Sequence, residues 1–299
     1  MRSLLGRLRW WARRDRAAAA ALAVIAVVAL ASLLAPSISP HPEQGAGAPN
    51  ITEKFQPPTA QHPFGTDNLG RDVLSRVLYG GRISLLIGVA VVIASAGIGT
   101  PLGALAGYVG GRTDELIMRI TDVFLAFPPL LLAIAVAAAL GPSLPNAIAA
   151  IAVTWWPWYA RIARGQASSL RQRHFVDAAR AIGVRDRSIV RRHVVPNLLT
   201  PVVVQATLDV GSAILTGAAL SFIGLGVQPP LTDWGLMVSE GRVYFMTRWW
   251  FALFPGVAIF VAVLATNLVG DSVRDLVDPR LGRPTVLKPL VDPTHEAAL

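Results

Sequence analysis

The chain of 299 residues is 53% hydrophobic and only 15% charged, with a mean hydropathy of +0.52 and a net charge of +9. Soluble domains carry about 25% charged residues, so this composition excludes an ordinary soluble protein and indicates that lipid is part of the solvent. The arginines flank apolar segments rather than forming one patch, which argues against nucleic-acid binding. The absence of cysteine excludes disulfides, thiolate metal sites and a cysteine nucleophile.

The N-terminal region combines a basic segment, residues 1–16, with an apolar run. Residues 17–35 carry no charge, and their length of 19 residues is about what a helix needs to cross the hydrocarbon core. A cleaved signal peptide has a similar layout and is the alternative. The run is long for a signal peptide, however, and the following "APSISP" is a poor cleavage site. We therefore expect a first transmembrane helix at 17–35.

The segment 36–81 is expected to form an external loop. Its first part, residues 36–63, is rich in proline, glycine and alanine and is expected to be extended. The stretch "TDNLGRDVLSRVLYGG" then predicts a short amphipathic helix, because its apolar residues recur on one face. Thr66 or Asp67 is expected to cap this helix.

Residues 82–283 are expected to form the core of the chain, with five further spans. Residues 123–160 carry no charge over 38 positions, which at about 1.5 Å per residue is too long for one transmembrane helix. The break "GPSLPN" at 141–146 therefore predicts two spans joined by a tight turn. A short external helix is expected after Thr232. The remaining spans are expected at 83–111, 198–232 and 249–270.

Six spans place both termini on one side of the membrane. With the termini inside, the inner segments hold 21 basic residues and the outer loops hold 6. The positive-inside rule therefore places the N-terminus, the loop 164–197 and the tail 284–299 in the cytoplasm.

The cytoplasmic loop has more pattern than a solvated basic loop requires. Residues 166–180 show helical periodicity, and Gly183 fits the left-handed position that ends a helix. Residues 185–193 predict a second short helix, which Pro196 is expected to stop. The preference of cytoplasmic loops for positive charge explains the arginines of this loop. It does not explain why the loop also has an apolar stripe and a glycine between two helices. We expect this loop to dock into a groove on another protein.

Motifs for bond chemistry are absent from the sequence. There is no glycine loop of the ATP-binding type, no His-Glu-x-x-His pair and no Gly-x-Ser-x-Gly elbow. No catalytic residue is therefore expected. No metal site is expected either, because the histidines are scattered along the chain, at His41, His62, His174, His193 and His295.

The loop resembles the "EAA" loop of ABC-importer permeases, which docks into the ATP-binding subunit in that family. The matching residues are Asp177, Ala178, Ala179, Arg180, Gly183, His193, Pro196 and Asn197. The stretches "HPFGTDNLGRDVLSRVLYGGRISL", "TDVFLAFPPLLLA", "ALSFIGLGVQPP" and "GDSVRDLVDPR" resemble the second permease subunit of the dipeptide/oligopeptide/nickel branch, over residues 17–283. Two positions depart from the pattern, since Asp177 replaces a glutamate and Gly217 stands where many relatives carry glutamate.

The resemblance implies an all-α membrane protein with six transmembrane helices, built as a type I ABC importer permease (MetI-like) core with an extra N-terminal helix. It implies import of di- or oligopeptides across the bacterial inner membrane. The implied partners are a homologous second permease, two ATP-binding subunits that bind ATP and Mg²⁺, and an extracellular substrate-binding protein. This chain would need no cofactor of its own and would bind no nucleic acid. Nickel or another small solute is the alternative cargo, and an uncoupled channel or scaffold is the alternative of another class.

Asp209 is the one charge in the fifth predicted span. A charge near mid-bilayer costs about 2.5–3.5 kcal/mol on insertion scales, so it is expected to face a partner or a water-filled path. The hypothesis is that Asp209 lines the transport pathway. A protonated or backbone-paired aspartate at a helix contact is the alternative.

Overall fold

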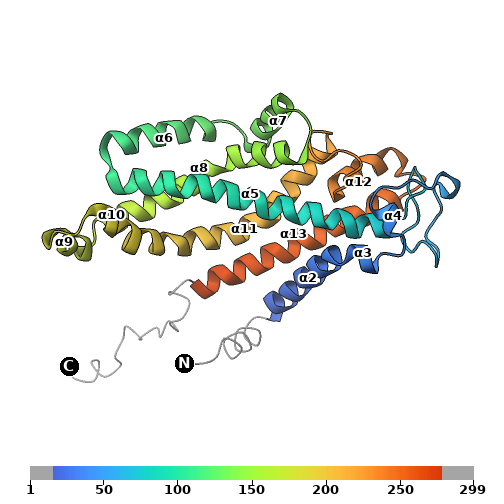
Figure 1. The fold of residues 1–299 in the computed structure, drawn as a ribbon, viewed down its shortest axis with the longest axis horizontal. Helices are drawn as coiled ribbons and strands as arrows, with labels where there is room; N and C mark the ends of the chain where they lie inside the picture. Colours follow the sequence, from blue (N-terminus) through green and yellow to red (C-terminus); the bar gives the residue numbers. More distant parts are fainter. Residues whose placement is uncertain (1–15, 278–299) are drawn as a thin grey trace, which may run out of the picture.

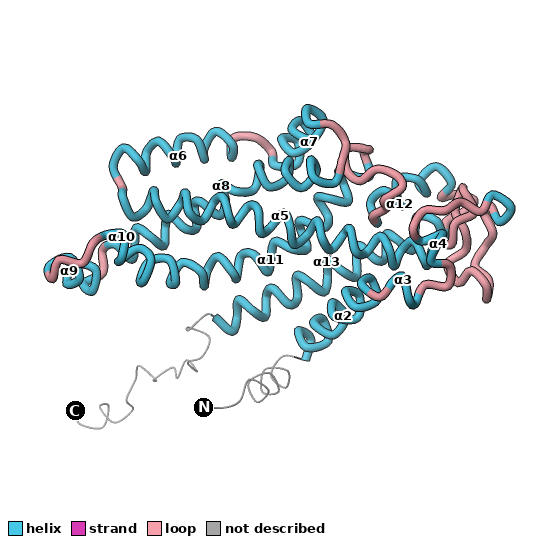
Figure 2. The backbone as a smooth tube through the Cα atoms, in the orientation of Figure 1, coloured by secondary structure: helices cyan, strands magenta, loops and turns pink. Residues whose placement is uncertain are grey.

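The computed structural model describes residues 16–277, and this part of the chain is a bundle of helices (Figures 1 and 2). Its long members are α2 (Arg16–Leu33), α5 (Val73–Val109), α8 (Leu144–Arg171), α11 (Val195–Phe222) and α13 (Trp250–Val277). Within the described range the structure contains no strand, only an isolated bridge between Thr66 and Asp72. The all-α class expected from the sequence is confirmed. Residues 1–15 of the predicted basic N-terminus, the tail 284–299 and His295 lie outside the described residues.

Four of the expected spans correspond to helices that are long and apolar enough to cross a membrane, at 16–33, 73–109, 186–222 and 250–275. The expected number of six is not confirmed. The count rises to five only if the bent pair α6 (Gly111–Leu125) and α7 (Pro129–Leu140) forms one broken span. The helix α8 is long enough but is not counted, because its middle carries Trp155, Trp156 and Trp158 together with Pro157, and arginines follow.

The third predicted span, from 123 to the break at 141, is wrong as a single helix. The chain bends by 89° between α6 and α7. Pro128 and Pro129 lie at the bend, where proline removes backbone donors and disfavours helical geometry in the preceding residue. The break at 141–146 is confirmed, since α7 ends at Leu140 and Ser143 caps α8 by accepting a hydrogen bond from the Asn146 backbone N–H at 3.2 Å.

The helices α5 and α8 pack backbone to backbone. Gly99, Gly103 and Gly107 form a small-residue stripe on α5 at four-residue spacing, and they face the backbone of α8 from Trp156 to Arg164. Small residues allow such close approach between membrane helices. The core beside this contact is formed by buried side chains of α5, α8 and α11, among them Ile87, Val91, Ile151, Tyr159 and Leu220.

The predicted short helix after Thr66 is not a separate element. It belongs to α5, which begins at Val73 and runs without a break for 37 residues. The N-cap residue of α5 is Asp72 rather than Thr66 or Asp67, because the Asp72 carboxylate accepts a hydrogen bond from the Ser75 backbone N–H at 2.7 Å. Thr66 and Asp67 are buried in the preceding loop.

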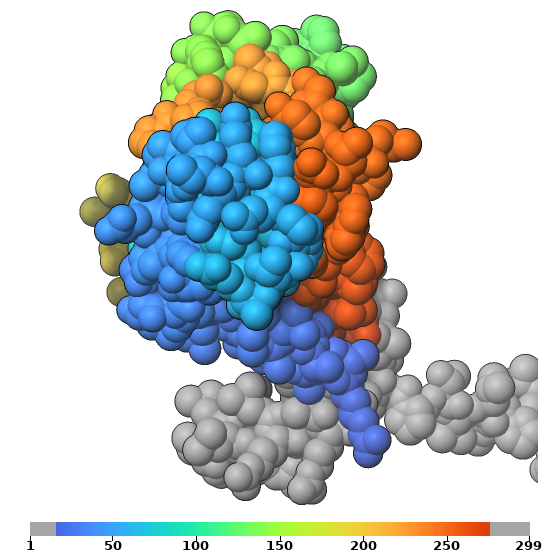
Figure 3. Space-filling view, turned by 90° about the vertical axis from the view of Figure 1, so that its right-hand side faces the viewer, coloured from blue at the N-terminus to red at the C-terminus, as the bar shows by residue number. Residues whose placement is uncertain are grey.

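The segment 36–72, which we call the cap, covers one end of the bundle. It is not fully extended. The short helix α3 (Ala35–Ile38) overlaps its start, and the turns α4 (Pro42–Gly45) and η1 (Ile51–Glu53) lie within it. Figure 3 shows the cap, in blue, beside the orange surface of the α12–α13 region.

The cap is joined to the bundle by buried ion pairs. Arg76 donates to Asp67 at 2.7 Å and to Glu240 of α12 at 2.8 Å, and Arg71 pairs with the same two carboxylates at 2.7 and 3.4 Å. Two arginines thus neutralise two carboxylates inside the protein, which is the condition for burying such charges.

The short helix expected after Thr232 is confirmed as α12 (Trp234–Gly241), and η3 (Arg242–Tyr244) follows it. Asp233 caps α12 by accepting a hydrogen bond from the Leu236 backbone N–H at 2.8 Å. The Asp233 side chain is fully buried, and this burial raises the pKa of the carboxyl to about 6.

Candidate functional site

The predicted docking loop lies at the end of the bundle opposite the cap (Figure 1). The helix α8 ends at Arg171, and α9 (His174–Ala181) begins after a two-residue break. The short helix α10 (Asp186–Ile189) follows and continues through a π-helical turn, η2 (Val190–Val194), into α11. We call residues 172–197 the docking segment.

Gly183 ends α9 in the way the sequence predicts. Its φ is +79°, in the left-handed region that favours glycine. The Gly183 N–H donates to the Arg180 carbonyl at 2.9 Å, and the Val184 N–H donates to the Ala179 carbonyl at 3.0 Å. These two bonds form a Schellman motif, which satisfies the last carbonyls of α9 and turns the chain toward α10.

An apolar cluster fixes the docking segment to the bundle. Val176 of α9 is fully buried together with Ile189, Val194 and Leu198, against α5 and α8. Ala179 is half-buried against the same cluster. Its small side chain therefore contacts this chain itself, although the resemblance places Ala179 in a loop that docks into a partner.

A polar contact at the base of α9 adds to this anchor. The hydroxyl of Tyr108, at the end of α5, donates to Asp186 at 2.6 Å. Arg180 donates to Asp186 at 3.1 Å and to the Tyr108 hydroxyl at 3.3 Å. These bonds hold α9 to α5 and α10, so Arg180 serves the internal structure of the segment.

The outer face of the docking segment is exposed. Phe175 and Ile182 are 44% and 80% exposed on this face of a basic segment. The Phe175 ring lies 5.8 Å from the ring of His193, edge to face. The exposed residues with predicted docking roles are Asp177, Ala178, Arg180, Gly183, His193, Pro196 and Asn197.

The predicted stop at Pro196 is wrong. Residues 186–222 form one continuous helical path, and Pro196 lies in the first turn of α11. Proline is tolerated in a first turn because the missing N–H needs no helical acceptor there, and the π-turn at 190–194 shifts the hydrogen-bond register just before it. The side chain of Asn197 donates to the His193 carbonyl at 2.6 Å in the same region.

Asp209 lies half-buried where α11 meets α8. It accepts hydrogen bonds from the Tyr159 hydroxyl at 2.7 Å and from the Gln205 side chain at 2.8 Å. Two side-chain donors thus satisfy the carboxylate at a helix contact. Its role in a pathway stays a hypothesis. Gly217 is buried against Ile87 of α5, where a larger side chain would clash.

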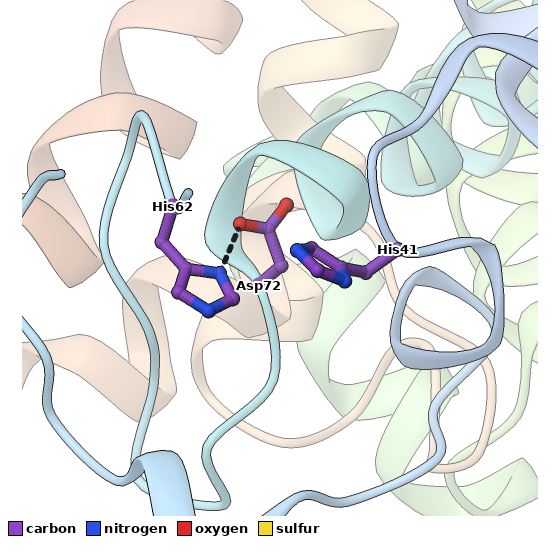
Figure 4. Close-up of side chains that lie close together, drawn as sticks. All are labelled: His41, His62 and Asp72. Carbon is purple, nitrogen blue, oxygen red and sulfur yellow. Dashed lines mark hydrogen bonds and ion pairs between the residues drawn. The ribbon is translucent and has the colours of Figure 1, made fainter. Parts of the chain in front are cut away.

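Two of the histidines are not scattered in space, contrary to the sequence expectation. The rings of His41 and His62 stack with centroids 4.7 Å apart, and both lie beside Asp72 (Figure 4). Sequence reasoning missed this group because no metal-binding motif has such spacing, and the cap's tertiary fold brings the residues together. His174 and His193 lie exposed on the docking segment, as expected for solvated residues.

Two family models match the chain. Residues 99–283 match the binding-protein-dependent transport system inner membrane component, and residues 3–58 match the N-terminal TM domain of oligopeptide transport permease C. The first match alone covers more than half of the chain.

Curated relatives match over about three quarters of both chains. The probable D,D-dipeptide transport system permease protein DdpC of Escherichia coli (strain K12) is 50% identical over 233 residues, which are 78% of each chain. The dipeptide transport system permease protein DppC of Alkalihalophilus pseudofirmus is 47% identical over 78% of this chain and 76% of the relative. The glutathione transport system permease protein GsiD of Escherichia coli O6:K15:H31 is 47% identical over 75% of this chain and 74% of its own.

Among solved structures, the fold is similar to a chain of the inward-facing MetNI methionine ABC transporter. The TM-score is 0.54 at 17% identity, covering 68% of this chain and 96% of that one. At this identity the likeness concerns the fold alone.

Proposed function

The chain belongs to the family of binding-protein-dependent transport system inner membrane components, and from this premise we propose that its cargo is a di- or oligopeptide. The chain is a permease subunit of an ABC importer, and in this family the ATPase activity lies in separate subunits. Two of the relatives are named as dipeptide transport permeases, and these names support a peptide as the cargo. Nickel or another small solute is the alternative cargo within the same machinery. Family membership argues against an uncoupled channel or scaffold.

The proposed assembly pairs this chain with a homologous second permease around one pathway in the bacterial inner membrane. Two ATP-binding subunits hold ATP and Mg²⁺ on the cytoplasmic side, and a substrate-binding protein delivers peptide to the external side, where the cap lies. Asp209 is proposed to border the pathway when the helices move, because it is half-buried at the α8–α11 contact.

The observation that carries the coupling role is the construction of the docking segment. Its inner face is locked by Val176 and by the contacts of Tyr108, Arg180 and Asp186, whereas its outer face leaves Phe175 and other residues exposed. Because the inner face of the docking segment is fixed to the bundle, a displacement of the segment would also displace α8 and α11. Closure of the ATP-binding subunits would thus move both helices and reorient the pathway.

The decisive test of coupling uses Ala178, which is exposed on α9. The variant Ala178→Asp adds a charge to the outer face without touching the buried cluster, and Ala178→Ser is the matched control. We expect the aspartate variant to insert into the membrane but to lose copurification with the ATP-binding subunits and substrate-stimulated ATP hydrolysis. Copurification at the normal level would refute the docking role.

The cargo is tested separately in proteoliposomes that contain the full complex and its binding protein. We expect uptake of a radiolabelled dipeptide that depends on ATP and is unaffected by excess Ni²⁺. Uptake of Ni²⁺ without peptide uptake would overturn the peptide assignment and leave the coupling role intact.

A further inference from the structure

The cap contains a group of side chains that the transport function does not explain. His41 precedes α4, His62 lies in the loop before α5, and Asp72 caps α5. One ligand atom from each of the three lies within 4.8 Å of the others. Figure 4 shows Asp72 beside the two imidazoles, with its carboxylate turned toward His62. His62 and Asp72 are fully buried, and His41 is half-buried.

His62 has one ring nitrogen paired and one without a hydrogen bond. Its Nδ1 lies 2.9 Å from Asp72 Oδ1. Its Nε2 is buried and has no hydrogen-bond partner among the described residues, although Glu53 Oε2 lies 3.3 Å away. A buried polar atom in this state loses its hydration without a hydrogen bond to replace it. A neutral imidazole carries one proton, so it cannot donate from both nitrogens at once.

A metal ion at Nδ1 resolves this conflict. When Nδ1 is the ligand, the imidazole proton resides on Nε2, which lies 3.3 Å from Glu53 Oε2. A small rotation of the ring or of the Glu53 side chain would complete a hydrogen bond there. This carboxylate–histidine–metal arrangement fixes the tautomer of metal-binding histidines generally. Asp72 can provide Oδ1 to the ion while Oδ2 keeps accepting from the Ser75 N–H, at 2.7 Å. The helix cap is therefore preserved.

We propose that His41, His62 and Asp72 bind a divalent transition-metal ion, with Glu53 orienting His62. Two imidazoles and one carboxylate form a donor set that suits Zn²⁺ and its first-row neighbours rather than Ca²⁺ or Mg²⁺, which prefer oxygen. Bonds of about 2.0–2.2 Å place two ligand atoms of a tetrahedral Zn²⁺ about 3.3–3.6 Å apart. The ligand atoms of the three side chains lie within 4.8 Å of one another, so the more distant of them would close by about 1 Å on binding the ion. Three protein ligands leave a further position for water.

The ion would connect three segments that are distant in sequence. It would join the start of α4, the loop around His62 and the first turn of α5. The ion would stabilise the cap. Its ligands come together only in the folded chain, so the free energy of metal binding would add to the stability of the folded state. The site lies outside the helix bundle and takes no part in the proposed coupling.

The test measures Zn²⁺ bound to the full chain, purified in detergent with an affinity tag that contains no histidine. After equilibrium dialysis, elemental mass spectrometry should find about one Zn²⁺ per chain. The variant His41→Gln should lose this ion and is suited to the test, since His41 is only half-buried. The control His193→Gln removes an exposed histidine at the opposite end and should retain the ion. Equal binding by the unchanged chain and His41→Gln would overturn the proposal.

A second measurement distinguishes lost ligation from a distorted fold. The chain has no cysteine, so His41→Cys introduces its only thiol. With Co²⁺ as the probe, ligation by this thiolate should produce a sulfur-to-cobalt charge-transfer band in the near ultraviolet. Its absence in a folded variant would contradict the site. Glu53→Gln should weaken Zn²⁺ binding about 10- to 100-fold, the usual effect of losing a carboxylate that orients a metal ligand.

Discussion

At the scale of single residues, Gly183 is the most constrained position of the docking segment. The variant Gly183→Val should reduce coupled transport strongly, because the left-handed conformation costs a side chain about 1–2 kcal/mol. No described atom lies within 4 Å of a Cβ added there, so the effect would arise from backbone conformation alone. Substrate-stimulated ATP hydrolysis of the reconstituted complex measures it.

The control for Gly183→Val is Gly183→Asn, because asparagine tolerates the left-handed region and also occurs at this position of helix ends. It should retain most of the activity. If valine and asparagine at position 183 gave the same ATP hydrolysis rate, the Schellman geometry would have no part in coupling.

Asp233 predicts a pH dependence of stability. Burial raises its pKa to about 6, from an ordinary value of 3.8. A raised pKa means that the folded state favours the protonated carboxyl of Asp233. The folded state is therefore most stable at low pH, and it loses this stability as the pH rises through about 6. The difference between these two pKa values corresponds to about 3 kcal/mol. The melting temperature in detergent should therefore fall between about pH 4 and pH 7.

Asp233→Asn should remove this dependence, since the amide oxygen can still cap α12 and carries no charge. The variant should melt at a higher temperature than the unchanged chain at pH values well above about 6, and the two should converge at low pH. Parallel melting curves of the two proteins across the whole pH range would contradict the assigned burial of a charge.

At the scale of helices, the glycine stripe of α5 predicts a sharp difference between two similar substitutions. Gly103→Ala should destabilise the chain, because its Cβ would overlap the Ala160 carbonyl oxygen of α8. Gly97→Ala on the same helix should be neutral or stabilise by about 0.5–1 kcal/mol, since alanine favours helices and no described atom lies within 4 Å of its Cβ. Thermal unfolding in detergent measures both, and similar melting temperatures would refute the close α5–α8 contact.

The ion pairs between the cap and α12 predict a second effect at this scale. Arg76→Ala leaves Asp67 and Glu240 facing each other with only Arg71 between them. Removing one partner of a buried ion pair costs about 3–5 kcal/mol. We expect a large fall in melting temperature and faster proteolysis of the cap. The exposed pair Arg119–Glu115 on α6 is the control, and Arg119→Ala should cost less than about 1 kcal/mol.

At the scale of the whole molecule, the placement of the docking segment and the cap at opposite ends predicts the topology (Figure 1). Single cysteines can be introduced without background because the chain has none. An impermeant thiol reagent should label Ala48→Cys in the exposed part of the cap in cells whose outer barrier is permeable to it. Ala181→Cys on α9 should be labelled only after the membrane is opened. The reverse pattern would invert the assigned orientation.

The sequence by itself determined the features that depend on local composition and short-range pattern. Long uncharged runs predicted six spans, and four of them correspond to helices that are long and apolar enough to cross a membrane, because the hydrocarbon core selects for length and hydropathy alone. Gly183 marked the end of α9, and the run after Thr232 marked α12, since both signals involve neighbours along the chain. Family motifs in the same stretches indicated the ABC-importer permease family.

Only the tertiary structure decided the features that depend on distant neighbours. The 89° bend between α6 and α7 and the continuous path through Pro196 reflect packing and a shifted hydrogen-bond register, which periodicity does not record. The partial burial of Ala179 depends on the cluster that α5, α8 and the docking segment form together. The group of His41, His62 and Asp72 exists because the cap folds back on the start of α5, over a separation of up to 31 positions. A sequence lists donor atoms in order along the chain, whereas their approach is set by the packing of the whole cap.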